Sequence, residues 1–199
     1  MIKEKLIYLV RHAEPDYPGG VRMCLGKRND LPLSAYGQTQ AQALKRFFES
    51  VPFEAVYASP LLRAQQTAQA IAGRTHPLHT IESLTELDGG QWDGLTFDQI
   101  RERYPGYFLP GSPDACPPDG ETDEDGTARM LSALHDVAGR TQRCAIIVAH
   151  SGVNRLLLCT LLGLPSSEKR RMRQGFAAVN LLAQTESGFT VRALDMDIR

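Results

Sequence analysis

Short apolar segments that alternate with helix-like segments place the strongest limit on what this chain can fold into. Three of them, residues 6–10, 55–58 and 144–149, have the length and composition of buried strands. Between them, apolar residues recur at helical spacing, as Ala41 and Leu44 do. Repeated strand–helix alternation predicts an α/β fold, a three-layer sandwich whose mostly parallel central sheet is flanked by helices.

Capping residues and apolar spacing predict five helices. Their expected starts are Ser34, Ser59-Pro60, Thr96, Thr122 and Ser151-Gly152. At the second of these, Ser59 is expected as the N-cap and Pro60 as the first helical residue. The helix at Thr122 has a capping-box-like start with Asp125 and is expected to end near Ala138.

The remaining segments complete the expected architecture. A further strand is expected over residues 78–84, and residues 176–184 with 189–194 predict an edge hairpin. Prolines and glycines between Pro105 and Asp119 predict that this stretch has no regular structure. We therefore expect a single domain over residues 1–199, with residues 86–128 as a lid-like insertion over the site.

Composition narrows the function classes. A net charge of −1 gives no electrostatic argument for binding nucleic acid or an anionic membrane. No apolar run has the length of a membrane span, and the first residues lead into a strand and not into a signal peptide. The four cysteines are scattered, without a CxxC pair or a histidine at metal-ligand spacing. We expect a cytoplasmic protein with reduced thiols, with neither metal nor cofactor; a homodimer is compatible with the sequence.

Charged and titratable residues follow the expected strands where each strand ends. Arg11 and His12 follow the first strand, Arg63 lies one turn into the helix after the second, Glu86 follows the third, and His150 ends the most apolar one. Sites of open α/β sheets form just beyond the carboxyl ends of the strands. Singly, each residue has an ordinary structural role, such as a solvated arginine or a buried core histidine. Together they predict one polar site.

Three segments resemble the histidine phosphatase superfamily, the phosphoglycerate-mutase-like group. They are residues 9–14 (Leu-Val-Arg-His-Ala-Glu), 58–68 (beginning Ala-Ser-Pro-Leu-Leu-Arg) and 148–152 (Val-Ala-His-Ser-Gly). Residues 31–38 also resemble the family's segment before its first long helix. The likeness runs from about residue 6 to 165, and Ala13 stands where the family motif Arg-His-Gly has its glycine. The resemblance implies a phosphoglycerate-mutase-like fold.

The resemblance also implies roles for the residues at the strand ends. His12 would be the nucleophile that becomes phosphohistidine, Arg11, Arg63 and His150 would hold the phosphoryl oxygens, and Glu86 would protonate the leaving oxygen. Phosphoryl transfer spreads charge over three oxygens, so positive donors around them suit the reaction. Two arginines disfavour the cation of His12, and a bound phosphate favours a proton on the acid.

The sequence offers further candidates for binding the substrate. The helix start at Ser151-Gly152 is expected to offer backbone donors to the anion. Arg22 is expected beside the substrate, where Arg22 or Lys27 meets a second anionic group; a solvated loop is the alternative. The charged run at 168–173 is interpreted as a solvated helix face.

Residues 84–95 distinguish between branches of the family. They resemble the Glu-x-x-x-Gly-x-Trp-Glu-Gly pattern of small phosphatases such as alpha-ribazole phosphatase, with Asp93 in place of the second glutamate. Residues 118–122 likewise resemble the Pro-Gly-Gly-Glu-Ser turn of those phosphatases. The mutases of the family carry tyrosine where Gly89 stands and asparagine where Pro18 stands. Their paired arginines are also missing, since the insertion holds only separated ones (Arg101, Arg103, Arg129).

These observations predict a metal-independent phosphomonoesterase that acts on a small phosphorylated metabolite, with alpha-ribazole phosphate as the most specific candidate. Two alternatives stay open. One is a cofactor-dependent phosphoglycerate mutase, and the other is a non-catalytic module that binds a phosphorylated ligand.

Overall fold

The computed structural model describes residues 4–108 and 116–198 of the chain. In these ranges one sheet has the strand order β3-β2-β4-β1-β5-β6. The strands are β1 (Lys5–Arg11), β2 (Val56–Ala58), β3 (Leu78–Thr80), β4 (Cys144–Ala149), β5 (Val179–Thr185) and β6 (Gly188–Met196). The neighbours β1, β4, β2 and β3 run parallel, whereas β5 runs antiparallel to both β1 and β6. The predicted mostly parallel sheet is therefore confirmed, with an antiparallel hairpin at one edge.

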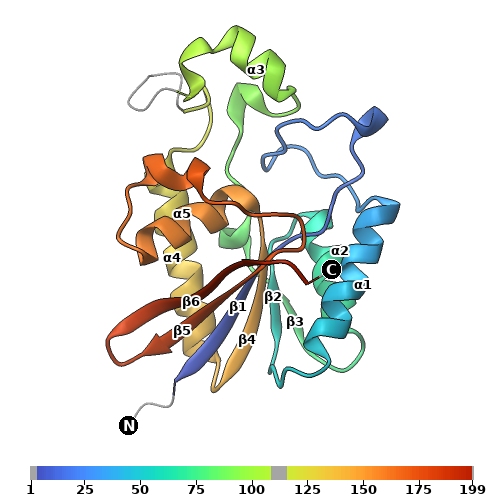
Figure 1. Ribbon diagram of the computed structural model, residues 1–199, viewed down its shortest axis with the longest axis vertical. Coiled ribbons are helices and arrows are strands. Elements are labelled where there is room, and N and C mark those ends of the chain that lie inside the picture. The colour runs from blue at the N-terminus through green and yellow to red at the C-terminus, as the bar shows by residue number, and fades with distance from the viewer. Residues whose placement is uncertain (1–3, 109–115, 199) are drawn as a thin grey trace.

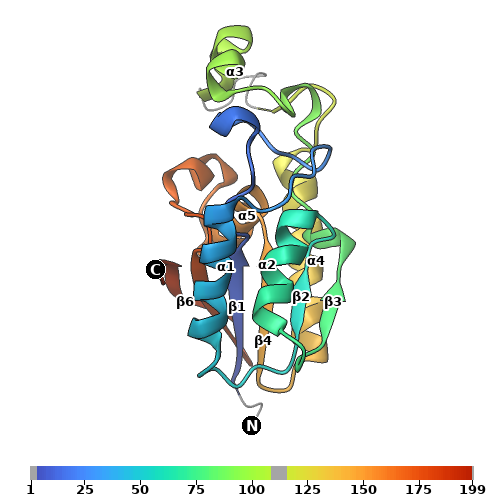
Figure 2. The ribbon, with the colours of Figure 1, turned by 90° about the vertical axis from the view of Figure 1, so that its right-hand side faces the viewer.

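Helices cover both faces of this sheet (Figure 1 and Figure 2). They are α1 (Ala35–Phe48), α2 (Leu62–Ala72), α3 (Phe97–Arg103), α4 (Asp123–Arg140) and α5 (Ser151–Leu161). Helices α1 and α2 lie on one face, and α4 and α5 on the other. This arrangement is the predicted three-layer sandwich.

The central strand β4 shows why the sequence folds in layers. Every residue of β4 is buried. Ile146 and Val148 pack in the cluster that includes α1 and α2, whereas Ala145 and Ile147 pack in the cluster that includes α4 and α5. A strand that is covered on both faces needs apolar residues at every position, which explains the continuous apolar run.

Most of the predicted helix starts are confirmed. The Ser34 hydroxyl accepts a hydrogen bond from the amide of Gly37, and Thr96 forms a capping box with Gln99. Thr122 accepts from the amide of Asp125. The predicted start at Ser59-Pro60 is wrong, because α2 begins at Leu62. Ser59 instead lies 2.7 Å from a ring nitrogen of His150, so its hydroxyl belongs to the polar site.

Two further predictions need correction. The strand expected over residues 78–84 covers only Leu78–Thr80, and a 3-10 helix (Glu82–Leu84) follows it. The stretch expected to lack regular structure begins with a 3-10 helix (Pro105–Phe108), while residues 109–115 lie outside the described ranges. The predicted edge hairpin is confirmed as β5 and β6.

Two long loops lie beyond the carboxyl ends of the parallel strands (Figure 1). One follows β1 and the other carries α3. They are joined by hydrogen bonds between the backbones of Cys24 and Leu95 (2.8 Å) and of Gly94 and Cys24 (2.9 Å). None of the helices in the described ranges combines the length and apolar character that crossing a membrane requires.

Candidate active site

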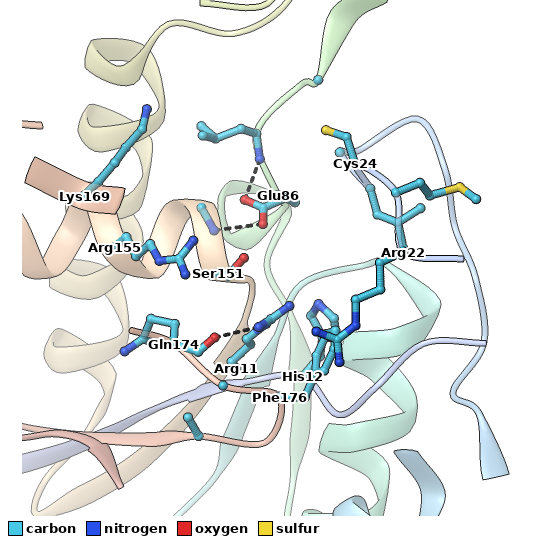
Figure 3. A pocket seen from close by; sticks show the side chains of 18 of the residues that line it. Arg11, His12, Arg22, Cys24, Glu86, Ser151, Arg155, Lys169, Gln174 and Phe176 are labelled. Carbon is cyan, nitrogen blue, oxygen red and sulfur yellow. Dashed lines mark hydrogen bonds between the residues drawn. The ribbon is translucent and has the colours of Figure 1, made fainter. Parts of the chain in front are cut away.

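A pocket of about 640 Å³ opens beyond the carboxyl ends of β1 and β4. Its lining includes Arg11, His12, Glu86 and Ser151 (Figure 3). Arg63 and His150 are fully buried next to these residues and are not part of the lining. The structure thus brings together all five side chains that were predicted at the strand ends. Three of them line the pocket, and the other two are buried beside it.

His12 is buried, with 4% of its surface exposed, and its ring orientation is fixed by its own neighbour. Nδ1 lies 2.7 Å from the carbonyl oxygen of Ala13. A carbonyl only accepts hydrogen bonds, so Nδ1 carries the hydrogen and Nε2 holds the lone pair of the neutral ring. Burial, followed by Arg63 and Arg11, lowers the pKa of His12 well below 6.5. The ring is therefore neutral near neutral pH, as a nucleophile requires, with burial a larger cause than the two arginines.

Arg11 ends β1 and is held by the segment that precedes β5. Its Nη1 donates to the carbonyl oxygen of Gln174 at 2.6 Å, and its Cζ lies 3.8 Å from the centroid of the Phe176 ring. Burial lowers the pKa of Arg11 to about 10, so the guanidinium stays charged at neutral pH. A desolvated cation of this kind interacts strongly with any anion beside it.

Arg63 is fully buried, and backbone carbonyls of the loop after β1 surround it. Nη1 donates to the carbonyl of Asn29 at 2.8 Å, and Nη2 donates to those of Gly26 (3.1 Å) and Leu25 (3.3 Å). Asp93 holds the same loop from the other side by accepting from the backbone amide of Gly26 at 2.9 Å. The interpretation of Arg63 as a solvated helix residue is thus excluded.

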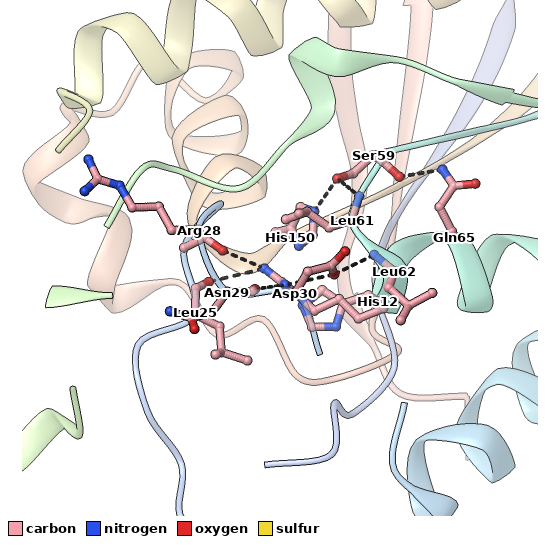
Figure 4. A network of polar contacts seen from close by, with 12 residues as sticks. His12, Leu25, Arg28, Asn29, Asp30, Ser59, Leu61, Leu62, Gln65 and His150 are labelled. Carbon is pink, nitrogen blue, oxygen red and sulfur yellow. Dashed lines mark hydrogen bonds and ion pairs between the residues drawn. The ribbon is translucent and has the colours of Figure 1, made fainter. Parts of the chain in front are cut away.

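His150 lies behind His12, with 5.0 Å between the two ring centroids. Its Nε2 is 2.7 Å from the Ser59 hydroxyl oxygen (Figure 4). That oxygen also accepts from the amide of Leu61 at 3.3 Å, so Ser59 joins His150 to the turn before α2. Burial, followed by the charge of Arg63, lowers the pKa of His150 well below 6.5, so this ring is also neutral.

Three buried nitrogen atoms of this group have no hydrogen-bond partner among the residues that the structure describes. They are Nε of Arg11, Nε of Arg63 and Nδ1 of His150. Buried polar atoms are rarely left unpaired, and those that are call for an explanation. All three belong to residues expected to hold phosphoryl oxygens, and the two arginine Nε atoms are donors.

Glu86 is fixed by the start of α5. Its Oε2 accepts from the amide of Gly152 at 2.9 Å, and its Oε1 accepts from the amides of Val153 (3.1 Å) and Leu87 (2.9 Å). At the helix start expected to offer donors to the substrate anion, the amides of Gly152 and Val153 therefore bind Glu86. A Cβ atom at position 152 would lie 2.5 Å from Oε1 of Glu86, so only glycine permits this approach.

The structure also places the further candidates for binding the substrate. Ser151 and Arg22 both line the pocket (Figure 3). The Cζ of Arg22 lies 5.3 Å from the centroid of the Phe176 ring, and its Nη2 lies 3.5 Å from the Glu14 carboxylate. Lys27 is not in the lining and pairs with Asp88 at 3.2 Å. Of the two cations proposed for a second anionic group, Arg22 is the one in the pocket.

A wall of basic residues was missed by sequence reasoning. Lys169, Arg170 and Arg173 line the pocket together with Arg155, whose Nε donates to the carbonyl of Met172 at 2.8 Å. The interpretation of residues 168–173 as a solvated helix face holds in part, since Arg170, Arg171 and Arg173 are exposed. The run, however, belongs to a 3-10 helix (Ser166–Arg171) that borders the pocket. Arg155 stands four residues after Ser151, on the same face of α5, and that spacing was a usable signal.

The described residues contain no group of three or more histidine, cysteine, aspartate or glutamate side chains that could hold a metal ion. The positive charges next to His12 come from arginine side chains.

Comparisons with known proteins agree with this geometry. The family model for the histidine phosphatase superfamily (branch 1) matches residues 7–197. The chain is 34% identical to 6-phosphofructo-2-kinase/fructose-2,6-bisphosphatase of Caenorhabditis elegans over 81% of its own length, which is only 35% of that protein. It is 32% identical to the "Probable phosphoglycerate mutase GpmB" of Proteus mirabilis, over 84% of this chain and 79% of that protein. Among solved structures, alpha-ribazole phosphatase from Shigella flexneri matches with a TM-score of 0.82 and 26% identity, over 96% of each chain.

Proposed function

Because the chain belongs to the histidine phosphatase superfamily, we propose that it hydrolyses phosphate monoesters through a phosphohistidine on His12. The observation that carries the proposal is a buried, neutral His12 in a pocket that Arg11 and Glu86 also line, with Arg63 and His150 buried next to it. The hydrogen on Nδ1 of this histidine leaves the Nε2 lone pair for attack on phosphorus. Donors placed where charge develops are the main requirement of phosphoryl transfer.

The proposed reaction has two steps. Nε2 of His12 attacks phosphorus, the bond from phosphorus to the ester oxygen breaks, and the Glu86 carboxylic acid protonates the departing oxygen. In the second step the Glu86 carboxylate takes a proton from water while that water attacks phosphohistidine, which releases orthophosphate and restores neutral His12. Arg11, Arg63 and His150 hold the phosphoryl oxygens in both steps.

The arginines of the insertion favour hydrolysis over mutase chemistry. Arg129 is bonded to the Glu121 carboxylate at 2.5 and 2.8 Å and to the carbonyls of Ser83 and Thr85. Arg101 pairs with Asp98 at 2.6 Å on an exposed helix surface. Neither is among the residues that line the pocket. The likeness to the protein named phosphoglycerate mutase GpmB nevertheless makes mutase activity the second candidate.

We propose a small phosphorylated metabolite as the substrate, with the described parts of the insertion, residues 86–108 and 116–128, as a lid-like cover. The pocket volume of about 640 Å³ leaves room for a leaving group next to the phosphoryl site. Aromatic side chains (Tyr17, Trp92, Phe176) and basic ones (Arg22, Arg155) both contribute to the lining. The likeness to alpha-ribazole phosphatase makes alpha-ribazole phosphate the first compound to test.

A panel of phosphorylated metabolites that includes alpha-ribazole phosphate tests the proposal. The wild-type protein is expected to release orthophosphate from at least one of them, and His12→Ala is expected to abolish this release. His135→Ala is the matched control, since His135 is exposed on α4. Binding of phosphate esters without turnover would instead identify a non-catalytic module. Transfer within phosphoglycerate in the presence of 2,3-bisphosphoglycerate would identify a mutase.

A further inference from the structure

Two buried amide side chains, Gln174 and Asn180, form a reciprocal pair beneath the active site. Nε2 of Gln174 donates to Oδ1 of Asn180 at 2.8 Å, and Nδ2 of Asn180 donates to Oε1 of Gln174 at 2.9 Å. Gln174 is 2% exposed and Asn180 is fully buried. Neither residue has a part in the proposed chemical steps.

Asn180 uses its whole hydrogen-bonding capacity. Its Nδ2 also donates to the carbonyl of Leu9 in β1 at 2.9 Å, and its Oδ1 also accepts from the amide of Asp195 in β6 at 3.0 Å. One side chain of β5 is therefore bonded to both neighbouring strands and to Gln174. A fully satisfied buried polar network fixes a single arrangement of the groups that it joins.

Gln174 connects the amide pair to Arg11 of the proposed reaction centre. The same residue whose side chain is held by Asn180 presents its backbone carbonyl to Nη1 of Arg11, at 2.6 Å. The guanidinium of Arg11 also lies against the Phe176 ring, two residues further along. A shift of residue 174 would therefore move the acceptor that sets the direction of the Arg11 guanidinium.

The segment of residues 173–178, which we call the strap, is tied to the end of β1 by its backbone. The amide of Arg11 donates to the carbonyl of Ala178 at 3.0 Å, and the amide of Ala177 donates to the carbonyl of His12 at 3.2 Å. At its other end, the amide of Gly175 donates to the Asp195 carboxylate at 2.7 Å. The strap thus contacts both residues of the Arg11-His12 pair, and the Gln174–Asn180 pair is its buried anchor.

A pair of apolar side chains could fill the same space without losing stability. The hydrogen bonds of a buried amide pair replace bonds to water, so their net contribution to the free energy of folding is small. Unlike an apolar pair, the amide pair fixes the orientation of the groups that it joins. We propose that Asn180 is a positioning residue that acts through Gln174 to aim the Arg11 guanidinium at the phosphoryl group. This inference rests on the proposed function, in which Arg11 holds that group.

A double-mutant cycle with inorganic orthophosphate as the probe tests this inference. Calorimetric titration of the wild type, Asn180→Leu, Arg11→Lys and the double variant gives four dissociation constants that do not depend on turnover. Asn180→Leu is expected to weaken orthophosphate binding roughly tenfold in the wild-type background. In the Arg11→Lys background, which lacks the guanidinium fork, the same substitution is expected to change binding less than about twofold.

Equal weakening in both backgrounds, or no weakening in the wild type, would overturn the inference. Leu182→Ala is the matched control: Leu182 is a buried residue of the same strand, and its loss is expected to reduce stability and leave orthophosphate binding unchanged. Should Asn180→Leu fail to fold, Gln174→Met removes the same pair and keeps the backbone carbonyl, and the same non-additivity with Arg11→Lys is expected.

The outcome is separable from that of the proposed function. Wild-type turnover that needs His12, together with an additive cycle, would reject only the positioning role of Asn180. A wild-type protein that binds orthophosphate and turns over no phosphate ester would reject the proposed function and leave the cycle interpretable.

Discussion

The amide of Gly152 donates a 2.9 Å hydrogen bond to the carboxylate of Glu86, and no larger residue fits at position 152 without meeting that carboxylate. The first turn of α5 therefore positions the proposed proton donor. The backbone donors of Gly152 and Val153 at this helix start bind the carboxylate of Glu86.

Gly152→Ala is expected to displace Glu86, because the new methyl group would lie 2.5 Å from Oε1. The value of kcat/KM for alkyl phosphates should fall by roughly a hundredfold, the lower end of the range for a lost general acid. Gly139→Ala is the control, since nothing lies within 4 Å of a Cβ there and the helix should gain about 0.5–1 kcal/mol. Wild-type kinetics in Gly152→Ala would contradict the claim that the close approach at Gly152 is needed to position Glu86.

Glu86→Gln removes the proton and nearly preserves the shape of the side chain. The value of kcat/KM, which reports transfer to His12, should fall much more for alkyl phosphates than for p-nitrophenyl phosphate, whose leaving group needs no acid. Glu82→Gln, an exposed residue of the preceding 3-10 helix, serves as the control. Equal losses for both substrates would mean that Glu86 is not the proton donor.

The buried histidines predict how stability depends on pH. Burial lowers the pKa of His12 and of His150 well below 6.5, so below that pH the unfolded chain binds protons that the folded protein does not. The stabilisation is fully present above pH 6.5 and is lost as the pH falls towards the folded pKa values. The slope approaches about 1.4 kcal/mol per pH unit for each histidine.

Urea unfolding between pH 5 and pH 8, roughly the range in which histidine titrates, measures this dependence. His150→Gln should flatten the decline on the acid side, whereas His135→Gln at the exposed position should not. A free energy of unfolding that stays constant down to pH 5 would contradict the neutral, buried state of the two rings.

Chelation of divalent metals should leave the activity unchanged. In the proposed reaction, the positive charge around the phosphoryl group comes from Arg11 and Arg63, and the nucleophile is a side chain. Turnover of p-nitrophenyl phosphate before and after incubation with EDTA measures the effect. A loss that added Mg²⁺ or Zn²⁺ reverses would assign a metal to the mechanism.

The sequence predicted the layers and the side chains at the strand ends because both depend on local pattern. Apolar runs such as residues 144–149 indicate strands that are buried on both faces, and the carboxyl ends of parallel strands meet at one edge. Arg11, His12 and Glu86 line one pocket for that reason, with Arg63 and His150 buried beside them.

What the sequence could not predict depends on partners that are distant along the chain. The residues at Ser59-Pro60 are typical of a helix start, yet the Ser59 hydroxyl is bonded to His150. The amide of Gly152 is bonded to Glu86, and Asn180 pairs with a residue of the strap. The run at 168–173 is exposed at Arg170, Arg171 and Arg173, as its composition predicts, but the composition could not show that the run borders the pocket.

Detection of phosphohistidine on His12 tests the central claim most directly. Glu86→Gln should accumulate the intermediate from p-nitrophenyl phosphate, because transfer to His12 proceeds while the base for the attacking water is missing. Mass spectrometry after an alkaline quench should find one acid-labile phosphoryl group on the peptide that contains His12, and none in the Glu86→Gln/His12→Ala protein. A phosphoryl group on another residue, or undiminished turnover by His12→Ala, would contradict the account.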